Sequence, residues 1–206
     1  MKKVLVACEE SQAVTIELRK LGIEAYSCDI EPCSGGHPEW HLQQDVLPLL
    51  KEKWDMIIAF PPCTYLSNAG ACRLYPKKGQ LDHVRYKKWL EAKEFFLSIL
   101  NADCPRIAVE NPVSSKVFNM PKHSQEIQPY MFGHPYTKKT RLWLKGLPDL
   151  IPTDLVEPIS PYVPSGTGRK DKSKYGAAKR GDDAKNRSKT FPGIAKAMAE
   201  QWSICL

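Results

Sequence analysis

The most informative part of this chain for its fold is the stretch Trp54-Asp55-Met56-Ile57-Ile58-Ala59-Phe60-Pro61-Pro62-Cys63-Thr64-Tyr65. Its consecutive apolar residues, Met56 to Phe60, are too few for a core helix and are typical of a strand buried on both faces. The two prolines end that strand, because neither can donate to a sheet ladder. Ligands bind outside the carboxyl ends of parallel strands, so Cys63 is predicted to lie where chemistry takes place. The alternative is that Cys63 packs as a small apolar residue.

A strand, a helix and a second strand are predicted upstream of this stretch. The apolar runs at residues 3–8 and 23–28 are typical of strands, and Asp29 follows the second. Between them, Ser11 is the predicted N-cap of a helix that stops at Gly22. This order opens a doubly wound sheet. The predicted fold class is therefore α/β, with a mostly parallel, twisted sheet and helices on both faces.

The same alternation continues downstream. Helices are expected at residues 46–53, 81–101 and 192–202, and strands at residues 106–109, 127–132 and 139–144. The strand at 106–109 runs into Glu110-Asn111-Pro112, so a proline again follows polar side chains at the end of a strand. Two neighbouring strands would then bring Cys63 and Glu110 to one edge of the sheet.

Two acidic residues stand where a nucleotide-type cofactor would bind. Asp29 ends the second strand, which is where ribose hydroxyls find an acidic partner. Asp45 precedes the helix expected at 46–53 and is either a plain N-cap or a cofactor ligand. The first turn has no Gly-x-Gly-x-x-Gly, which argues against a dinucleotide pyrophosphate. The helix after Ser11 could still bind a small carboxylate through its free N–H groups.

The composition sets the context of the protein. At 206 residues, one domain is expected, large enough to bury a core without staples. The seven cysteines are odd in number and no pair has the spacing of a zinc knuckle. Neither a disulfide framework nor a structural metal is therefore indicated. Free thiols, no signal peptide and no long apolar run indicate a reducing, cytoplasmic setting without a membrane partner. We expect a monomer.

The net charge of +7 is concentrated in one segment. Between Ser165 and Thr190, nine Lys and Arg residues stand against three Asp residues, a balance of +6. Such a segment suits DNA, because phosphate contacts release counterions. The alternative is a solvated loop. The DNA-binding candidates are Lys139, whose strand face also carries Arg141 and Trp143, and, in the basic segment, Arg169, Lys170, Lys172, Lys174, Lys179 and Arg180.

Four motifs, in this order, resemble those of the C5-cytosine DNA methyltransferases, especially the short forms encoded by phages and prophages. Phe60-Pro61-Pro62-Cys63 is similar to the catalytic Pro-Cys motif, and Glu110-Asn111-Pro112 to the Glu-Asn motif. Residues 137–143, Thr-Lys-Lys-Thr-Arg-Leu-Trp, resemble the Gln-x-Arg-x-Arg strand, and residues 186–192 the closing Gly-Asn-Ser segment. The resemblance covers most of the chain. It implies a Rossmann-like fold that uses S-adenosylmethionine, in a bacterial host or phage-infected cell.

The resemblance also implies a catalytic set of Cys63, Glu110, Asn111 and Arg141. A cysteine thiolate can add to the C6 carbon of cytosine, and a carboxyl group hydrogen-bonded to ring nitrogen N3 makes that addition easier. A cation near O2, here Arg141, would steady the same negative charge. The activated C5 carbon then takes the methyl group of S-adenosylmethionine, and loss of the C5 proton releases Cys63. A base within a duplex must be flipped out, unless single-stranded DNA is used.

The cofactor contacts follow from the same resemblance. Asp29 would bind the ribose hydroxyls, Asp45 the adenine amino group, and the turn at residues 7–11 the methionine end. The implied cofactor-binding residues are Ala7, Glu9, Ser11, Asp29, Ile30, Asp45, Val46, Pro61, Arg187, Ser188 and Thr190.

The chain departs from the family's pattern in several places. The first turn, residues 7–11, lacks the Phe-x-Gly-x-Gly of large members, and Thr137 replaces a glutamine. The long recognition domain is reduced to a Pro-rich and basic insertion. We therefore divide the chain into a catalytic core (residues 1–150), a DNA-contacting insertion (residues 151–190) and a C-terminal helix that packs back on the core (residues 191–206).

Arg187 falls where the family has an asparagine. An arginine beside the methyl donor could pair with a carboxylate, bidentately if the geometry allows. Our hypothesis is that the enzyme accepts carboxy-S-adenosylmethionine and transfers a carboxymethyl group. The alternative is that Arg187 contacts a DNA phosphate.

Two other classes of protein remain as alternatives to a C5-cytosine methyltransferase. Amino-methyltransferases of adenine or cytosine place an aromatic residue after Pro-Pro, where this chain has Cys63. A non-catalytic DNA-binding protein could retain the methyltransferase fold, although the presence of both Cys63 and Glu110 argues against lost catalysis.

Overall fold

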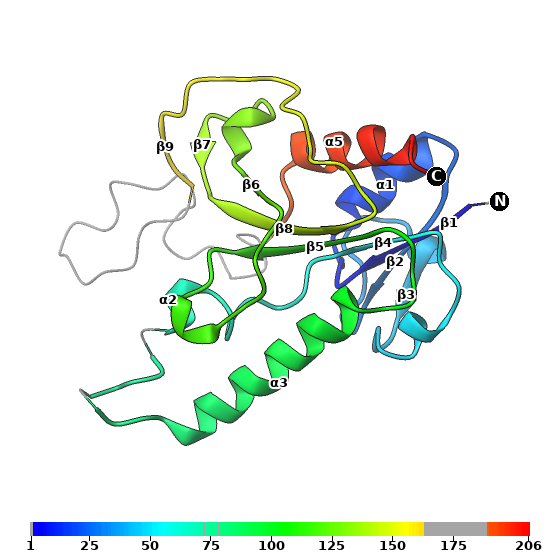
Figure 1. Ribbon diagram of the computed structural model, residues 1–206. Helices are drawn as coiled ribbons and strands as arrows, with labels where there is room; N and C mark the ends of the chain where they lie inside the picture. The colour runs from blue at the N-terminus through cyan, green and yellow to red at the C-terminus, as the bar shows by residue number, and fades with distance from the viewer. Residues whose placement is uncertain (1, 72, 78, 163–188) are drawn as a thin grey trace.

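A computed structural model of the chain describes residues 2–71, 73–77, 79–162 and 189–206. Within these residues the centre is a seven-stranded sheet in the order β3-β2-β1-β4-β5-β8-β6 (Figure 1). The strands β1 to β5 run parallel, whereas β8 pairs antiparallel with both β5 and β6. The bounds are β1 (Lys3–Ala7), β2 (Glu24–Asp29), β3 (His41–Gln43), β4 (Met56–Ala59), β5 (Ile107–Pro112), β6 (Gln125–Ile127) and β8 (Thr140–Lys145).

The central strands β1 and β4 are apolar on both sides, which is why helices can cover both faces. Every residue of β4 is buried, as are the last four residues of β1. The chain leaves β1 toward β2 and β3 and then returns to the other side of β1 to form β4. The strand order therefore reverses between β1 and β4, and ligands of such sheets bind outside the carboxyl ends at that point.

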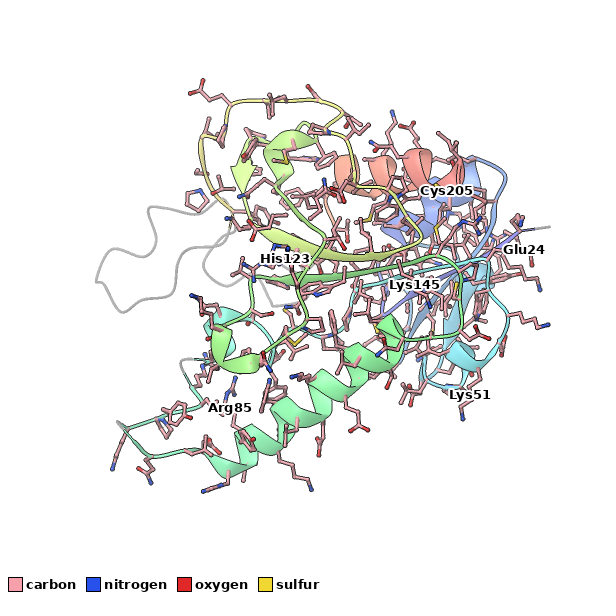
Figure 2. The ribbon with its side chains drawn as sticks, viewed as in Figure 1. Glu24, Lys51, Arg85, His123, Lys145 and Cys205 are labelled. Carbon is pink, nitrogen blue, oxygen red and sulfur yellow. The ribbon has the colours of Figure 1, made fainter. Side chains whose placement is uncertain are left out.

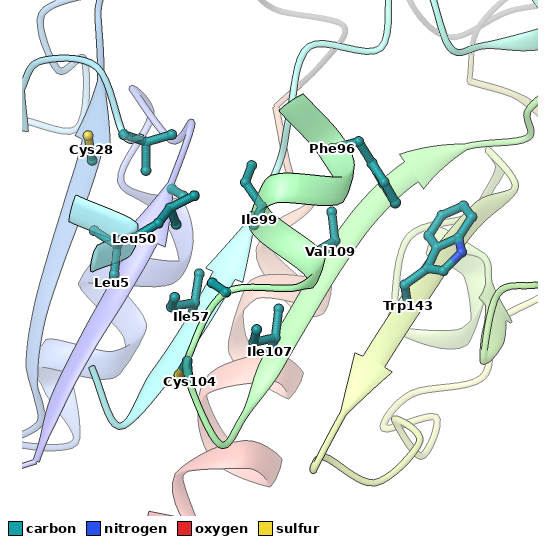
Figure 3. Packing of buried hydrophobic residues seen from close by; sticks show 14 of the residues in the cluster. Leu5, Cys28, Leu50, Ile57, Phe96, Ile99, Cys104, Ile107, Val109 and Trp143 are labelled. Atoms are coloured by element: carbon teal, nitrogen blue, oxygen red, sulfur yellow. The ribbon is translucent and has the colours of Figure 1, made fainter. Parts of the chain in front are cut away.

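The helix α3 (His83–Leu100) covers one face of the sheet, and α1 (Ala13–Lys20) and α5 (Pro192–Ser203) lie side by side on the other (Figure 1). Under α3, Phe96 and Ile99 are fully buried against strand residues such as Val109 and Trp143 (Figure 3). On the opposite face, Met198 and Trp202 of α5 belong to the second core cluster. The predicted mostly parallel sheet with helices on both faces is confirmed.

Three local predictions need correction. Gln12 rather than Ser11 precedes α1, with a left-handed backbone (φ 58°) and no side-chain cap. The helix expected at residues 46–53 is one 3-10 turn, Leu49–Lys51, which starts only after Pro48. The strand expected at 127–132 ends at Ile127, and a 3-10 turn follows at Pro129–Met131 because Pro129 lacks the N–H that a sheet ladder needs.

Smaller elements surround the carboxyl edge of the sheet. A four-residue helix, α2 (Asn68–Ala71), follows the Cys63 segment, and β7 (Tyr136–Thr137) pairs in parallel with β9 (Ser160–Pro161). Further 3-10 turns are Pro38–Trp40 and Lys116–Phe118. Across the part of the chain that the structure describes, no helix has the length and apolar character needed to cross a bilayer.

Candidate active site

Cys63 lies at the carboxyl edge of the sheet, just beyond β4. The Phe60 N–H donates to the Ala7 carbonyl (3.0 Å), which extends the pairing with β1 by one residue. The Cys63 carbonyl then accepts the N–H groups of Leu66 (3.1 Å) and Ser67 (2.9 Å), which closes a turn. The cysteine residue is half-buried and belongs to neither of the two core clusters.

Glu110 and Lys138 lie close enough to Cys63 for their charges to act on its thiol. Burial raises the pKa of Cys63, the charge of Glu110 raises it further, and Lys138 lowers it. Burial also raises the pKa of Glu110, against the opposing effects of Lys138 and of a hydrogen bond with the Thr140 side chain. The site thus holds a thiol that must lose its proton before it attacks, and a carboxyl group able to stay protonated and donate a hydrogen bond.

The register of β5 against β8 decides which basic residue reaches Glu110. Glu110 pairs with Leu142, whereas Arg141 pairs with Asn111. Successive side chains of a strand point to opposite faces, so Arg141 lies on the face away from Glu110. Its Nε there donates to the Glu126 carboxylate at 2.9 Å. The structure therefore does not bring Arg141 to Glu110, and the role of Arg141 near O2 of the cytosine ring stays a prediction.

The cation beside Glu110 is Lys138, which the sequence analysis did not select. Lys138 and Thr140 line the same cavity as Glu110. The Lys138 Nζ also lies 5.9 Å from the ring centre of Tyr162 and 5.7 Å from that of Phe191. The alternation of side chains along β8 is the sequence signal that could have identified Lys138. Once Glu110 pairs with Leu142, Thr140 lies on the same face of the sheet as Glu110, and continuing the alternation two residues before the strand adds Lys138. That pairing is set by tertiary contacts and could not be read from the sequence.

Lys139, the predicted DNA contact outside the basic segment, is occupied by an ion pair. Its Nζ lies 3.0 Å from Glu126 Oε2, on the carboxylate that also accepts from Arg141. Half of the Lys139 side chain is exposed, so it can still meet a phosphate only in competition with Glu126. The surface pair is worth little by itself.

A small cavity opens between Glu110, Lys138 and α5. Its volume is about 20 Å³, room for about one water molecule. A pyrimidine ring needs more space, so a base could enter only if a wall moved. Phe191 belongs to its wall, and the ring of Phe191 in turn meets that of Tyr162 edge to face at 4.7 Å, with Tyr136 5.6 Å from Tyr162. The lining residues are Phe60, Glu110, Ile127, Pro129, Lys138, Thr140, Thr190, Phe191, Ile194 and Met198.

Asn111 supports the end of β5 from the face opposite Glu110. Its side chain is fully buried, and Nδ2 donates to the Ser114 hydroxyl (2.9 Å) and the Pro112 carbonyl (2.7 Å). Its Oδ1 has no hydrogen-bond partner among the residues described. Nearby, the Asn68 N–H donates to the Val113 carbonyl (2.8 Å), which ties the segment after Cys63 to the end of β5. Asn111 therefore lies in the support of the site rather than at its reacting atoms.

The candidate cofactor residues gather at the carboxyl ends of β1 and β2. The carboxylates of Asp29 and Asp45 both add to burial in raising the pKa of the Cys8 thiol, so both lie next to the turn after β1. Ile30 is 72% exposed beside Asp29, and Val46 is buried beside Asp45. Carboxylates that accept hydroxyl and amino groups, next to an exposed aliphatic side chain, fit an adenosine group. Ala7 and Pro61 are buried at the ends of the two adjoining strands.

Glu9 occupies the amino terminus of α1 instead of facing a ligand. Its carboxylate accepts the N–H groups of Val14 (2.6 Å) and Thr15 (3.2 Å) and the Thr15 hydroxyl (2.7 Å). Burial raises the pKa of Glu9 to about 7 in spite of these bonds. The donors that were expected to bind a small carboxylate are thus used by the chain itself. Ser11 is half-buried, with its carbonyl so close to Gly35 that a Cβ there would lie 2.6 Å away.

Thr190 lies just before α5 and lines the cavity beside Glu110. The start of α5 is fixed by His134, whose Nε2 accepts the Gly193 N–H at 3.0 Å. Burial lowers the pKa of His134, which favours the neutral ring that this bond requires. The other sequence-predicted residues, Arg169, Lys170, Lys172, Lys174, Lys179, Arg180, Arg187 and Ser188, lie outside the described residues, and their roles stay predictions.

No protein-family model matches the chain, and no curated protein matches it. The chain is similar to solved structures. One is an Escherichia coli protein described as a prophage-encoded DNA modification methyltransferase (14% identity, 79% of this chain and 53% of that one, TM-score 0.46). Another is a mutant of Spodoptera frugiperda DNMT2 (15%, 78% and 58%, TM-score 0.45). A third is an rRNA methylase from Escherichia coli (18%, 70% and 57%, TM-score 0.38).

The chain thus spans little more than half the length of these structures. Likenesses of this size concern the fold alone. The strand order and its reversal between β1 and β4 show by themselves the doubly wound, mostly parallel α/β sheet that was predicted.

Proposed function

We propose that this protein is a DNA (cytosine-5-)-methyltransferase that uses S-adenosylmethionine and forms a covalent adduct through Cys63. The observation that carries the proposal is the grouping of Cys63, Glu110 and Lys138 at the carboxyl edge of the sheet. A nucleophile, a proton donor and a cation are the three groups that addition to a cytosine ring requires. The proposal is supported by Asp29 and Asp45, which lie near Cys8 at the carboxyl end of β1, the strand that pairs with β4.

The proposed reaction begins at sulfur. The Cys63 thiolate bonds to the C6 carbon of cytosine, and the electron pair of the C5–C6 double bond moves into the ring. The protonated Glu110 carboxyl group hydrogen-bonds to ring nitrogen N3, where negative charge develops, and its raised pKa keeps the proton available. The ammonium group of Lys138 stabilises the same charge from the side of O2, the task that the resemblance gave to Arg141.

The second half of the reaction returns the enzyme to its starting state. Bound S-adenosylmethionine would supply the methyl group: the sulfonium S–CH3 bond would break as C5 bonds to the methyl carbon, and the thioether S-adenosylhomocysteine would leave. Water would then accept the C5 proton, so that the C5–C6 double bond reforms and the carbon–sulfur bond to Cys63 breaks, which returns Cys63 as a thiolate. Asp29 would hold the ribose hydroxyls and Asp45 the adenine amino group, while Ile30 would contact the adenine ring. These proposed cofactor contacts are independent of the proposed covalent chemistry of Cys63 and can be tested separately.

DNA would reach the site through basic residues. The predicted contacts are Lys139 and the basic segment, whose charge of +6 suits a polyanion. Because the cytosine C5 and C6 carbons are buried in a duplex, the base must be extruded or already unpaired. We also propose that the protein acts as a cytoplasmic monomer.

A covalent trap tests the proposal directly. DNA that carries 5-fluorocytosine cannot lose a proton from C5, so a methylated adduct with Cys63 should accumulate and survive denaturing electrophoresis. The matched control is Cys63→Ser, which should give no adduct. An amino-methyltransferase would methylate the DNA without forming an adduct, and a non-catalytic DNA-binding protein would give neither methylation nor an adduct. Either of these results with the unmodified protein would refute the proposal.

The donor is a separate question. Arg187 supports the alternative that carboxy-S-adenosylmethionine is used and a carboxymethyl group is transferred, because an arginine can pair with a carboxylate. Mass spectrometry of nucleosides after incubation with an equal mixture of the two donors distinguishes them. A product that contains only 5-methylcytosine excludes the carboxymethyl alternative.

A further inference from the structure

A basic and aromatic surface lies next to Cys63 and has no role in the chemistry above. It consists of Tyr65, residues 73–77 and residues 79–93, and we call it the basic arm. Figure 1 shows that the segment before α3 and the amino-terminal half of α3 project beyond the sheet, and Figure 2 labels Arg85 there. Its acids are Asp82 and Glu91, against the bases Arg73, Lys77, Arg85, Lys87, Lys88 and Lys93.

The basic arm is fastened to the Cys63 segment. Arg85 donates through Nε to the Gly70 carbonyl (3.3 Å) and through Nη2 to the Thr64 carbonyl (3.4 Å). The Asp82 N–H donates to the Leu74 carbonyl (2.9 Å), which folds the segment back onto the start of α3. Gly70 packs so closely on the Thr64 carbonyl that a Cβ would collide with it. The basic arm is therefore joined through Arg85 to Thr64, the residue that follows Cys63.

Several of its cations are available to a ligand. Arg73, Lys77 and Lys87 are exposed and make no ion pair within the described residues. Isolated solvated lysines would be unremarkable on a surface. Because the arm that carries them is fastened to Thr64, beside a candidate nucleophile for cytosine, they favour a polyanion that passes along the arm.

The aromatic residues distinguish one kind of polyanion from another. Tyr75 is 49% exposed and Tyr86 is 37% exposed, and both stand among the cations. Tyr65, two residues from Cys63, has Arg85 4.9 Å and Lys88 5.9 Å from its ring centre. Exposed rings in a basic groove are stacking platforms for unpaired bases, whereas a duplex hides its base faces. Phosphate contacts alone would not need the tyrosines.

We propose that the basic arm binds single-stranded nucleic acid, with phosphates on Lys77 and Lys87 and bases stacked on Tyr75 and Tyr86. The strand would then lead an unpaired cytosine to Cys63, and no base pair would have to be broken. This inference deepens the proposed function by naming the strand state of its substrate. The arm itself could bind a single strand even if the chemistry at Cys63 were different.

Fluorescence anisotropy of labelled oligonucleotides tests the proposal. The Cys63→Ser variant is titrated with single-stranded DNA, single-stranded RNA and duplex DNA of the same sequence, each about 20 nucleotides long so that it exceeds one binding site. We expect at least one single strand to bind about 10-fold more tightly than the duplex. Equal or tighter binding of the duplex overturns the proposal. Preference for RNA over DNA keeps the inference but redirects the proposed function to RNA.

Variants then locate the contact. Replacing both tyrosines, Tyr75→Ala with Tyr86→Ala, should weaken single-strand binding about 10- to 100-fold, the size of lost base stacking, while Tyr→Phe at both positions preserves it. Lys77→Ala with Lys87→Ala should lower the salt dependence by about 1 in the log–log slope. The matched control is Lys20→Ala with Lys196→Ala, which removes the same charge from α1 and α5. An equal effect of that control, or equal loss of duplex and single-strand binding in the tyrosine variant, contradicts the proposal.

The outcome is independent of the trapping experiment. Single-strand binding without any adduct at Cys63 would refute the proposed function and leave this inference standing. An adduct with duplex DNA, together with no preference for single strands, would support the proposed function and refute this inference.

Discussion

Glu110 on β5 and Lys138, just before β8, lie on the same side of the sheet, and the charge of the lysine opposes the rise in the pKa of the carboxyl group that burial causes. The same lysine lowers the pKa of Cys63, whereas Glu110 raises it. One cation therefore acts on both the candidate nucleophile and the candidate proton donor. Neither the proline-terminated strands nor the motif order pointed to it.

Lys138→Met should slow formation of the 5-fluorocytosine adduct by about 10²–10³-fold, the usual cost of losing a charge-stabilising group. Arg141→Met is the matched control and should change the rate less than about 5-fold, because Arg141 lies on the opposite face with Glu126. Single-turnover trapping measures both. A larger loss in the Arg141 variant would restore the assignment that the resemblance implied.

Glu110→Gln should lower methyl transfer by about 10²–10⁴-fold, since the amide cannot protonate a ring nitrogen. Thermal unfolding of the same variant should show no loss of stability, because burial already disfavours the charged carboxylate. Activity close to the unmodified protein would mean that Glu110 only supports the strand end.

The rate of adduct formation should depend on pH through two groups. It should rise with pH as the Cys63 thiol, whose pKa is raised, becomes a thiolate, and fall when Glu110 loses its proton. In Glu110→Gln the fall at higher pH should disappear while the rise remains. If the rate in Glu110→Gln still falls at higher pH, the fall is caused by the titration of a group other than Glu110.

Glu9 should make the stability of the fold depend on pH. Its pKa is raised from 4.5 to about 7, so the folded state binds its proton more tightly than the unfolded chain. Stability is then full below about pH 4.5 and decreases as the pH rises through about 7, by about 3 kcal/mol in all. Urea unfolding at several pH values measures this slope. Glu9→Gln should flatten it, and the exposed control Glu200→Gln should not.

Gly193→Ala should destabilise the start of α5. A Cβ at this position would collide with the Phe132 carbonyl, so the helix end and the adjoining cavity wall at Phe191 must shift. We expect a loss of about 1–3 kcal/mol, as for other overpacked sites. Lys196→Ala, on the exposed side of the same helix, should stay within about 0.5 kcal/mol. Equal unfolding midpoints for the two variants would contradict this packing argument.

Local sequence patterns were enough to predict a mostly parallel sheet and the two strand ends that carry Cys63 and Glu110. Runs of apolar residues and the prolines after them act locally, because a proline removes a ladder donor whatever surrounds it. The boundaries of one helix and one strand were predicted wrongly. Pro48 and Pro129 show why: a proline within an apolar stretch can shorten an element that hydrophobicity alone extends.

Which side chains meet depends on long-range pairing between strands. The pairing of Glu110 with Leu142 places Lys138 beside the candidate catalytic groups and turns Arg141 away to Glu126. Glu9 likewise turned inward to the start of α1, although its position in the chain suggested a cofactor contact. A strand's side chains change face with every residue, so a shift of one position in pairing exchanges the two sets. That register is set by a partner strand far away in the chain, and no local pattern records it.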